Sequence, residues 1–178
     1  MPLLLLVAAA AALIALMTNK NGGAAAPSGK AGFFTRLRPV ASAVERETGI
    51  KADLGMVQAA HESAYGSSQL TREANNLFGF TGDSWKAAGK PVVEMPPWEV
   101  INGRRVELTR PFRRYGSWDE SYRDWARLMQ TPRYAAALAA ARAGNLKAFA
   151  AALQAAGYAT DPAYAAKLEG VARAAGVA

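Results

Sequence analysis

Two glutamates stand where acid–base chemistry could be done, and Glu62 is the better placed. It lies in "DLGMVQAAHESAYGSSQL" (Asp53 to Leu70), near the C-terminal end of a predicted helix and beside His61, the only histidine. The unsatisfied carbonyl groups of a helix end carry partial negative charge, and together with partial burial they disfavour a carboxylate. We therefore expect a raised pKa for the Glu62 carboxyl, which would keep it protonated near neutral pH, as a general acid requires.

The alternative for Glu62 is an ordinary solvated glutamate at a helix end. Three features of the surrounding sequence favour chemistry. The small residues Ser63 and Ala64 leave room for a ligand, and a Gly/Ser turn follows them. The apolar turn "NNLFGFTG" comes shortly afterwards and could form the wall of a cleft.

The second candidate carboxylate is Glu99, in "PPWEVINGRR". Asn102-Gly103 between two extended runs is the strongest short signal for a β-hairpin, and Glu99 would point to the opposite face from Trp98 and Val100. A carboxylate on a small β-lobe that faces another on a helix is the two-carboxylate arrangement of glycosidases. Most strand glutamates face solvent, however, and Glu94 and Glu107 compete for the same role.

The elements that must position these carboxyls are mostly helices. One predicted helix runs from Phe33 to Gly49, and a second follows with Asp53 as its N-cap and Gly66 as the residue that stops it. On this second helix, residues 54, 57, 61 and 65 share one face at helical spacing.

Helices resume after the hairpin. Ser117 and Glu120 form a predicted capping box before the first of them. The alanine-rich helices that follow begin at Pro132, at the N-cap Asn145 and at the N-cap Asp161. Helices around one short hairpin predict an α+β fold that is mostly helical.

The N-terminus differs from the rest in composition. Residues 1–18 are an apolar segment, and residues 19–32 form a Gly/Ala/Pro/Ser linker that we expect to be flexible, so the folded domain should cover residues 33–178. The uncharged run from Pro2 to Met17 is shorter than the roughly 20 residues that span a bilayer comfortably. Three interpretations stay open: an uncleaved export anchor, an atypical signal peptide, and a helix that docks in a larger assembly.

The charge balance predicts an anionic partner. The chain has 21 Lys and Arg against 14 Asp and Glu, a net charge of +7. Nucleic acid is the weakest candidate, because the largest basic cluster, "RPFRRYG", is short and no basic run is interleaved with aromatic residues. Because the chain has no cysteine and only one histidine, we expect it to bind neither a metal nor another cofactor.

Four motifs together resemble those of a known family. "QAAHESAYGSSQL", "NNLFGFTG", "WEVINGRRVELTRPFRRYGS" and "GYATDPAYAAKL" are similar, in this order, to the flagellar-type β-N-acetylglucosaminidases, family 73 of the glycoside hydrolases. The resemblance covers roughly residues 33–171. It implies a lysozyme-like α+β domain with a small β-hairpin lobe. It also implies an extracytoplasmic enzyme that cleaves the β-1,4 bond between N-acetylglucosamine and N-acetylmuramic acid in peptidoglycan.

The resemblance also assigns roles to single residues. Glu62 matches the general acid, Glu99 the carboxylate of the β-lobe, and Tyr158 a tyrosine that orients the sugar or its N-acetyl group. The chain departs from the family pattern at Pro97-Trp98, immediately before Glu99. The residues expected to contact substrate are Asn76, Phe78 and Gly79 of the cleft wall, Trp98 as a surface for sugar stacking, and Tyr115 at the exit of the lobe.

Several alternatives stay open at this point. Glu99 could activate a water molecule, or the substrate's own N-acetyl oxygen could attack with Tyr158 orienting it. A lytic transglycosylase or a muramidase would use a similar helix-end glutamate. An alternative from a different class is a structural component: residues 1–18 could dock the domain in a phage tail or a secretion assembly.

Overall fold

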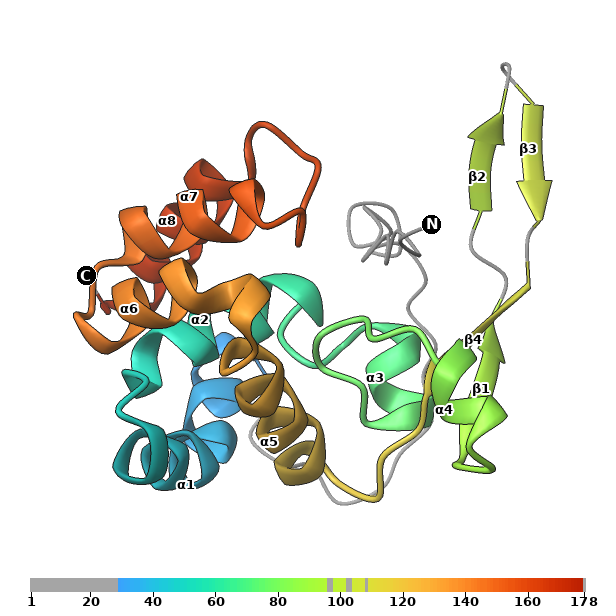
Figure 1. Ribbon diagram of the computed structural model, residues 1–178, viewed down its shortest axis with the longest axis horizontal. Helices are drawn as coiled ribbons and strands as arrows, with labels where there is room; N and C mark the ends of the chain where they lie inside the picture. The colour runs from blue at the N-terminus through green and yellow to red at the C-terminus, as the bar shows by residue number, and fades with distance from the viewer. Residues whose placement is uncertain (1–28, 96–97, 102–103, 108, 178) are drawn as a thin grey trace.

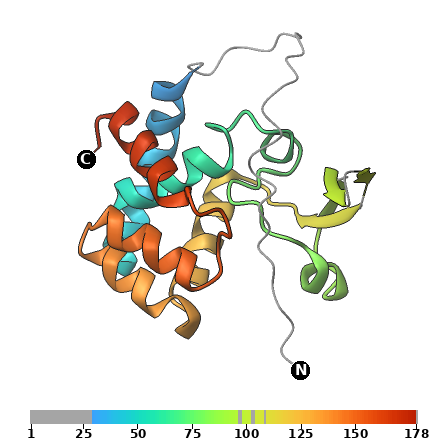
Figure 2. The same ribbon diagram turned by 90° about the horizontal axis from the view of Figure 1, so that it is seen from above.

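A helical body and a small β-lobe stand side by side in the computed structural model (Figure 1, Figure 2). The backbone is described for residues 29–95, 98–101, 104–107 and 109–177, and side chains are described in these ranges except within 98–107. The helices and the 3₁₀ turn η1 are α1 Lys30–Thr48, α2 Ala52–Glu62, α3 Gln69–Ala74, α4 Asp83–Ala87, α5 Trp118–Met129, η1 Pro132–Tyr134, α6 Ala135–Arg142, α7 Leu146–Ala155 and α8 Tyr164–Ala175. The strands are β1 Val92–Met95, β2 Trp98–Ile101, β3 Arg104–Glu107 and β4 Arg110–Arg113.

Helix α2 is the centre of the helical body. Every residue from Leu54 to Ala60 is buried, so the helix is enclosed on all sides rather than along one stripe. It packs against α1 and α8, and the aromatic rings of α5 cover Gly55. Small residues such as Gly55 and Ala59 allow this close approach, because they leave space for the side chains of neighbouring helices.

The β-lobe is one long hairpin made of two ladders. β1 pairs antiparallel with β4, and β2 pairs antiparallel with β3, with Ile101 opposite Arg104. This register confirms the predicted hairpin, although residues 102–103 themselves lie outside the described part of the chain. Leu70, Ala74, Met95 and Phe112 form a small core of their own beneath the lobe.

Two predicted boundaries of α2 are wrong. The helix begins after Lys51 rather than Asp53, because the Glu45 carboxylate of α1 accepts a hydrogen bond from Ala52 N at 2.9 Å and so caps the helix from outside. Asp53 instead pairs with Arg38. The helix also ends at Glu62, before Gly66, because the chain turns through left-handed conformations already at residues 64 and 65.

The other predicted caps fare differently. Ser117 and Asn145 accept the expected hydrogen bonds from Glu120 N and Ala148 N, which confirms both. The Glu120 carboxylate accepts a hydrogen bond from Gly116 N rather than from Ser117 N, one residue outside a standard capping box. Asp161 accepts from Ala163 N, but this closes a turn, and α8 begins only at Tyr164.

The apolar segment 1–18 lies outside the described residues. Helix α1 begins at Lys30, so the regular structure starts before the predicted boundary at Phe33. Among the helices that the structure describes, none has the length and apolar character needed to cross a membrane.

The close packing of α2 leads to a prediction about two helical glycines. A Cβ on Gly55 would lie 2.0 Å from the Tyr122 hydroxyl and 2.8 Å from the Trp125 ring, whereas a Cβ on Gly170 in α8 would meet nothing within 4 Å. We expect Gly55→Ala to lower the free energy of unfolding by about 1–3 kcal/mol through overpacking. The matched control Gly170→Ala should raise it by about 0.5–1 kcal/mol. Urea denaturation measures both, and equal effects of the two substitutions would contradict this packing.

Candidate active site

Glu62 occupies the last position of α2, which confirms the prediction that it lies near the C-terminal end of this helix. The turn that follows is fixed by Ser63, whose hydroxyl donates to Ala59 O at 2.6 Å and accepts from Gly66 N at 2.8 Å. Gly66 has a φ of 78°, and a Cβ there would lie 2.5 Å from the Trp118 ring. This tight turn ends the helix at Glu62 and so fixes the backbone position from which the Glu62 side chain extends.

The Glu62 side chain is partly buried, and one direct partner of its carboxyl is found among the described residues. Tyr164, the first residue of α8, donates its hydroxyl hydrogen to Glu62 Oε1 at 2.8 Å. Burial raises the pKa of Glu62 to about 7, and the Tyr164 hydrogen bond acts in the opposite direction by stabilising the carboxylate. The predicted rise in pKa is therefore confirmed, and its main cause is burial.

A buried polar side chain lies one helical turn below Glu62. Gln58 is fully buried on α2, and its Oε1 accepts a hydrogen bond from Trp125 Nε1 at 2.9 Å.

Burial raises the pKa of the Tyr158 and Tyr164 hydroxyls, and the nearby Glu62 raises both further. Both tyrosines therefore stay protonated, so they remain hydrogen-bond donors when Glu62 is ionised.

Tyr158 is buried in the segment between α7 and α8. Its hydroxyl donates to Phe78 O at 3.3 Å, which ties this segment to the predicted cleft wall. The structure thus brings together Glu62, Tyr158 and the cleft-wall turn. It also adds Tyr164, which sequence reasoning did not single out. Tyr164 lies within the motif "GYATDPAYAAKL", but the motif does not show that its partner Glu62 lies 102 residues earlier in the chain.

Two of the predicted cleft-wall residues are buried inside the protein. The Asn76 amide donates to Phe80 O at 2.9 Å and to Arg113 O at 3.0 Å, and its oxygen accepts from Phe80 N. Phe78 is stacked on Trp125 with ring centroids 5.3 Å apart. These contacts show that both residues shape the wall from within, while their direct contact with a substrate stays a prediction.

Gly79 and Tyr115 have different surroundings. Gly79 adopts a φ of 69°, and no atom of the described residues lies within 4 Å of where its Cβ would be. Tyr115 is buried, and its hydroxyl donates to Asp124 Oδ2 at 2.7 Å, an oxygen that also accepts from Arg113. Because its hydroxyl is already engaged, Tyr115 fixes the connection from β4 to α5, and a role in substrate binding stays a prediction.

The two predicted site residues of the lobe lie on β2. Trp98 pairs with Glu107 and Glu99 with Val106 in the β2–β3 ladder. Their side chains fall outside the described part of the structure, so both roles stay predictions. Within the described residues, no three His, Asp or Glu side chains come close enough together to hold a metal ion.

These features define a class of protein. A carboxyl with a pKa near 7 at the end of a buried central helix, beside an antiparallel hairpin lobe, is the arrangement of a lysozyme-like glycosidase. The particular family follows from three comparisons with known proteins.

The family model of glucosaminidases, described as mannosyl-glycoprotein endo-beta-N-acetylglucosaminidase, matches residues 38–176. The peptidoglycan hydrolase FlgJ of Salmonella typhimurium is 40% identical over 117 residues, which cover 62% of this chain and 36% of that protein. A probable N-acetylmuramidase of Lactococcus lactis is 36% identical over 124 residues, 69% of this chain and 27% of that protein. A solved structure of a truncated glycoside hydrolase domain from S. typhimurium FlgJ shares 36% identity and a TM-score of 0.67, covering 84% of this chain and 99% of its own.

The chain therefore belongs to the glucosaminidase family, family 73 of the glycoside hydrolases. This confirms the resemblance drawn from the four motifs, and the structural likeness confirms the lysozyme-like α+β fold. The chain spans about a third of the length of the FlgJ proteins that it matches, 35% to 38%.

The Tyr164 hydrogen bond leads to a prediction about the titration of Glu62. Tyr164→Phe removes a donor to the carboxylate, so the ionised form is less stable and the pKa of Glu62 should rise above its value of about 7. The matched control is Tyr134→Phe, which removes the hydroxyl of another buried tyrosine and should leave the titration of Glu62 unchanged. Carbon-13 NMR of the glutamate carboxyls measures both, and an equal pKa in the two variants would show that the hydrogen bond has no effect.

Proposed function

We propose that this domain hydrolyses the β-1,4 bond between N-acetylglucosamine and N-acetylmuramic acid in peptidoglycan, with Glu62 as the general acid. The observation that carries this proposal is the placement of Glu62 at the end of α2, with Tyr164 donating to its carboxyl, where burial raises its pKa to about 7. Near neutral pH this carboxyl is partly protonated, which general-acid catalysis requires. Family membership supports the reaction class, and the net charge of +7 suits a wall polymer that carries carboxylates.

The mechanism begins with transfer of the Glu62 proton to the glycosidic oxygen as the bond to the anomeric carbon breaks. The Glu62 carboxylate that remains is stabilised by the hydrogen bond from Tyr164. Positive charge develops at the anomeric carbon at the same time. A nucleophile on the opposite face of the sugar must then complete the reaction.

Two nucleophiles are consistent with the residues of this chain. If Glu99 activates a water molecule, the configuration inverts, and the two carboxyls must be about 6.5–9.5 Å apart during the reaction. If the substrate's N-acetyl oxygen attacks, with Tyr158 orienting it, the configuration is retained. Proton NMR of the first product distinguishes them, because an α-anomer would assign Glu99 as the base and a β-anomer would assign the N-acetyl group.

Removal of the acid should abolish turnover. We expect Glu62→Gln to lower the hydrolysis rate of purified sacculi by about 10²–10⁴-fold, since an amide cannot protonate the leaving oxygen. The matched control Glu73→Gln changes an exposed glutamate on α3 and should keep the wild-type rate. The products are reduced with borohydride, and their new sugar ends are identified by mass spectrometry.

Each product of this digestion has a distinct meaning. Reduced N-acetylglucosamine ends support the proposal, reduced muramic ends would make the enzyme a muramidase, and 1,6-anhydro ends a lytic transglycosylase. If the folded wild type formed no new ends, a structural role in an assembly would replace the enzymatic one.

As a check on folding, Glu62→Gln should be more stable than wild type above pH 7, because burial destabilises the ionised Glu62 of the wild type.

The pKa of Glu62 also predicts the pH dependence of the rate. Only the protonated carboxyl can donate, so kcat/KM should fall as the pH rises through about 7. Tyr164→Phe should move this alkaline limb to higher pH, because it raises the pKa of Glu62. A stopped assay on soluble glycan fragments between pH 5 and pH 9 measures the limb, and an alkaline limb at the same pH in both proteins would contradict the assignment.

We infer an extracytoplasmic site of action, where peptidoglycan lies. The apolar segment 1–18 would attach the domain to a membrane or to a virion or secretion assembly. Fractionation of cells that express the full chain, compared with a chain that lacks residues 1–28, tests this attachment. Equal release of both proteins into the soluble fraction would argue against it.

A further inference from the structure

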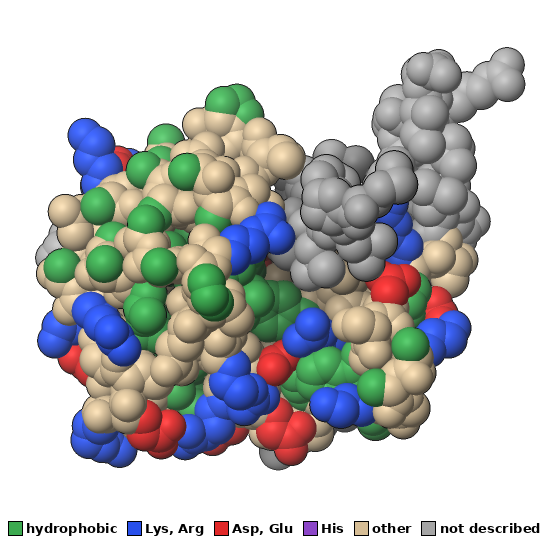
Figure 3. Space-filling model, in the orientation of Figure 1, with side chains coloured by type: hydrophobic (Ala, Val, Ile, Leu, Met, Phe, Trp, Pro, Cys, Tyr) green, Lys and Arg blue, Asp and Glu red, His purple; other side chains and the backbone are tan. Residues whose placement is uncertain are grey.

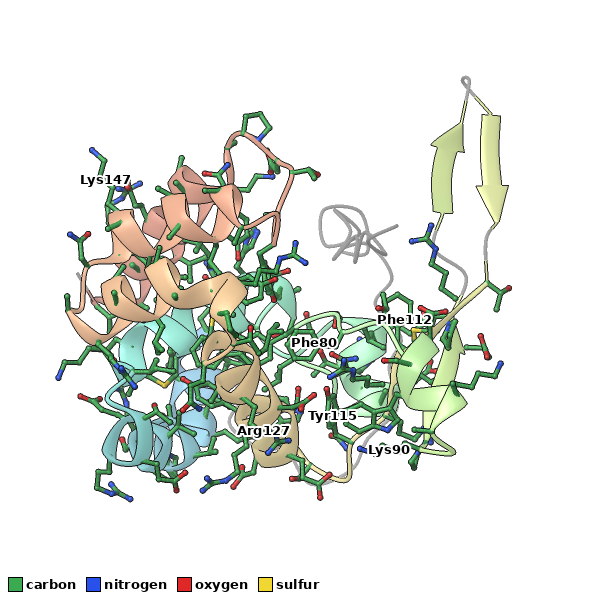
Figure 4. All side chains as sticks on the ribbon, in the orientation of Figure 1. Phe80, Lys90, Phe112, Tyr115, Arg127 and Lys147 are labelled. Atoms are coloured by element: carbon green, nitrogen blue, oxygen red, sulfur yellow. The ribbon has the colours of Figure 1, made fainter. Side chains whose placement is uncertain are left out.

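A groove of about 400 Å³ lies where the β-lobe meets the helical body. The α4 side contributes Trp85, Lys90 and Pro91, and α5 contributes Glu120, Arg123 and Arg127. The connection between β4 and α5, residues 114–116, forms its floor. We call this the α4–α5 groove. Lys90, Tyr115 and Arg127 lie along the lower part of the molecule in Figure 4, where Figure 3 shows Lys and Arg side chains interspersed with Asp and Glu.

The charge of the α4–α5 groove is predominantly positive. Four cationic side chains line it, against one carboxylate, Glu120. Arg123 is paired with Glu47 at 2.7 Å, and Arg127 with Asp124 at 3.0 Å. Lys90 and Arg114 have no carboxylate partner within the described part of the chain, so they can bind a carboxylate without breaking an existing ion pair.

Trp85 lines the groove, and its polar atom lies inside the protein. Its indole Nε1 is buried and has no hydrogen-bond partner among the described atoms. A buried N–H group without an acceptor is destabilising and rare in folded proteins. Lys90 Nζ lies 4.7 Å from the centroid of the same ring, so a carboxylate bound by Lys90 would lie close to Trp85.

The walls of the groove indicate what kind of anion would fit. Trp85 and Tyr115 stand edge to face with centroids 5.3 Å apart, and Pro91 extends this apolar wall. Such a wall suits methyl and methylene groups rather than a chain of phosphates. The exposed Glu120 carboxylate accepts one hydrogen bond, from Gly116 N, and retains acceptor capacity for an ammonium group. The complementary ligand is a short peptide that carries carboxylates and an amine.

Peptidoglycan, the substrate of the proposed function, presents such a ligand on its glycan strands. We propose that the α4–α5 groove binds the stem peptide of peptidoglycan, with Lys90 and Arg114 on its carboxylates, the Trp85 ring beside it and Glu120 on its free amine. The groove joins lobe and body, so a bound stem peptide contacts both parts of the domain. This inference rests on the proposed function for the identity of its ligand, and it concerns residues that do not touch Glu62.

Binding is tested with a synthetic stem tetrapeptide that ends in a diamino acid and alanine and has free carboxylates. The full chain carries only four tryptophans, so the indole signal of Trp85 can be assigned in a nitrogen-15 NMR spectrum with Trp85→Phe. We expect this signal to shift on titration with the peptide. We also expect the double variant Lys90→Gln, Arg114→Gln to raise the dissociation constant about tenfold, as loss of charge-assisted contacts does.

The control variant removes the same charges elsewhere. The control is the double variant Arg46→Gln, Lys147→Gln, which changes an exposed arginine of α1 and an exposed lysine of α7. Figure 4 shows Lys147 on the other side of the body from Lys90. This variant should bind the peptide like wild type. No shift of the Trp85 signal, or an equal shift with a peptide whose carboxylates are amidated, would overturn the proposal. So would a shift with inorganic phosphate and none with the peptide, because the groove would then recognise phosphate.

Kinetics separate this proposal from the proposed function. The Lys90→Gln, Arg114→Gln variant should raise KM on intact sacculi and leave kcat/KM unchanged on glycan strands stripped of their peptides by an amidase. Equal effects on both substrates would overturn the peptide site while leaving the hydrolase intact. If the wild type cleaved neither substrate, the proposed function would fail, and the NMR titration would still decide whether the groove binds the peptide.

Discussion

The hydrogen bond between Tyr164 and Glu62 is the interaction on which the rest of the site depends. It joins the end of α2 to the beginning of α8, and it holds a carboxyl that burial would otherwise leave without a partner. A buried ionisable group is tolerated only when its surroundings satisfy it in both protonation states. The tyrosine meets this condition for the carboxylate, and burial stabilises the protonated form. The same local structure can therefore hold a proton and release it.

The surrounding body provides the rigidity that such a site needs. Helix α2 is enclosed by α1, α5 and α8, and the Gln58 amide on it is fixed by Trp125 Nε1. The turn predicted to form a cleft wall is fastened from within by Asn76, and Tyr158 ties it to the α7–α8 connection. A site held by a packed helix and by buried hydrogen bonds keeps its geometry better than one carried by a loop.

The lobe is connected to the body in a different way. Its contacts at the α4–α5 side rest on Asp124, which accepts hydrogen bonds from Tyr115 and Arg113, and on stacked charged and aromatic side chains around Trp85. These polar contacts leave a cationic groove between lobe and body. Catalytic chemistry and peptide recognition would then use two separate surfaces of one small domain, both bounded by the elements that the hairpin connects.

The sequence by itself determined the class of fold, the hairpin, the position of Glu62 at a helix end and the membership of the family. These features are encoded locally, in capping residues, in the Asn-Gly turn and in short motifs whose order along the chain is specific. The tertiary structure alone decided the boundaries of α2, where Glu45 caps from another helix, the partnership of Glu62 with Tyr164, and the α4–α5 groove. Each of these depends on residues far apart in the chain, and only packing brings such residues into contact. Local sequence propensity carries no information about which distant residues will come into contact.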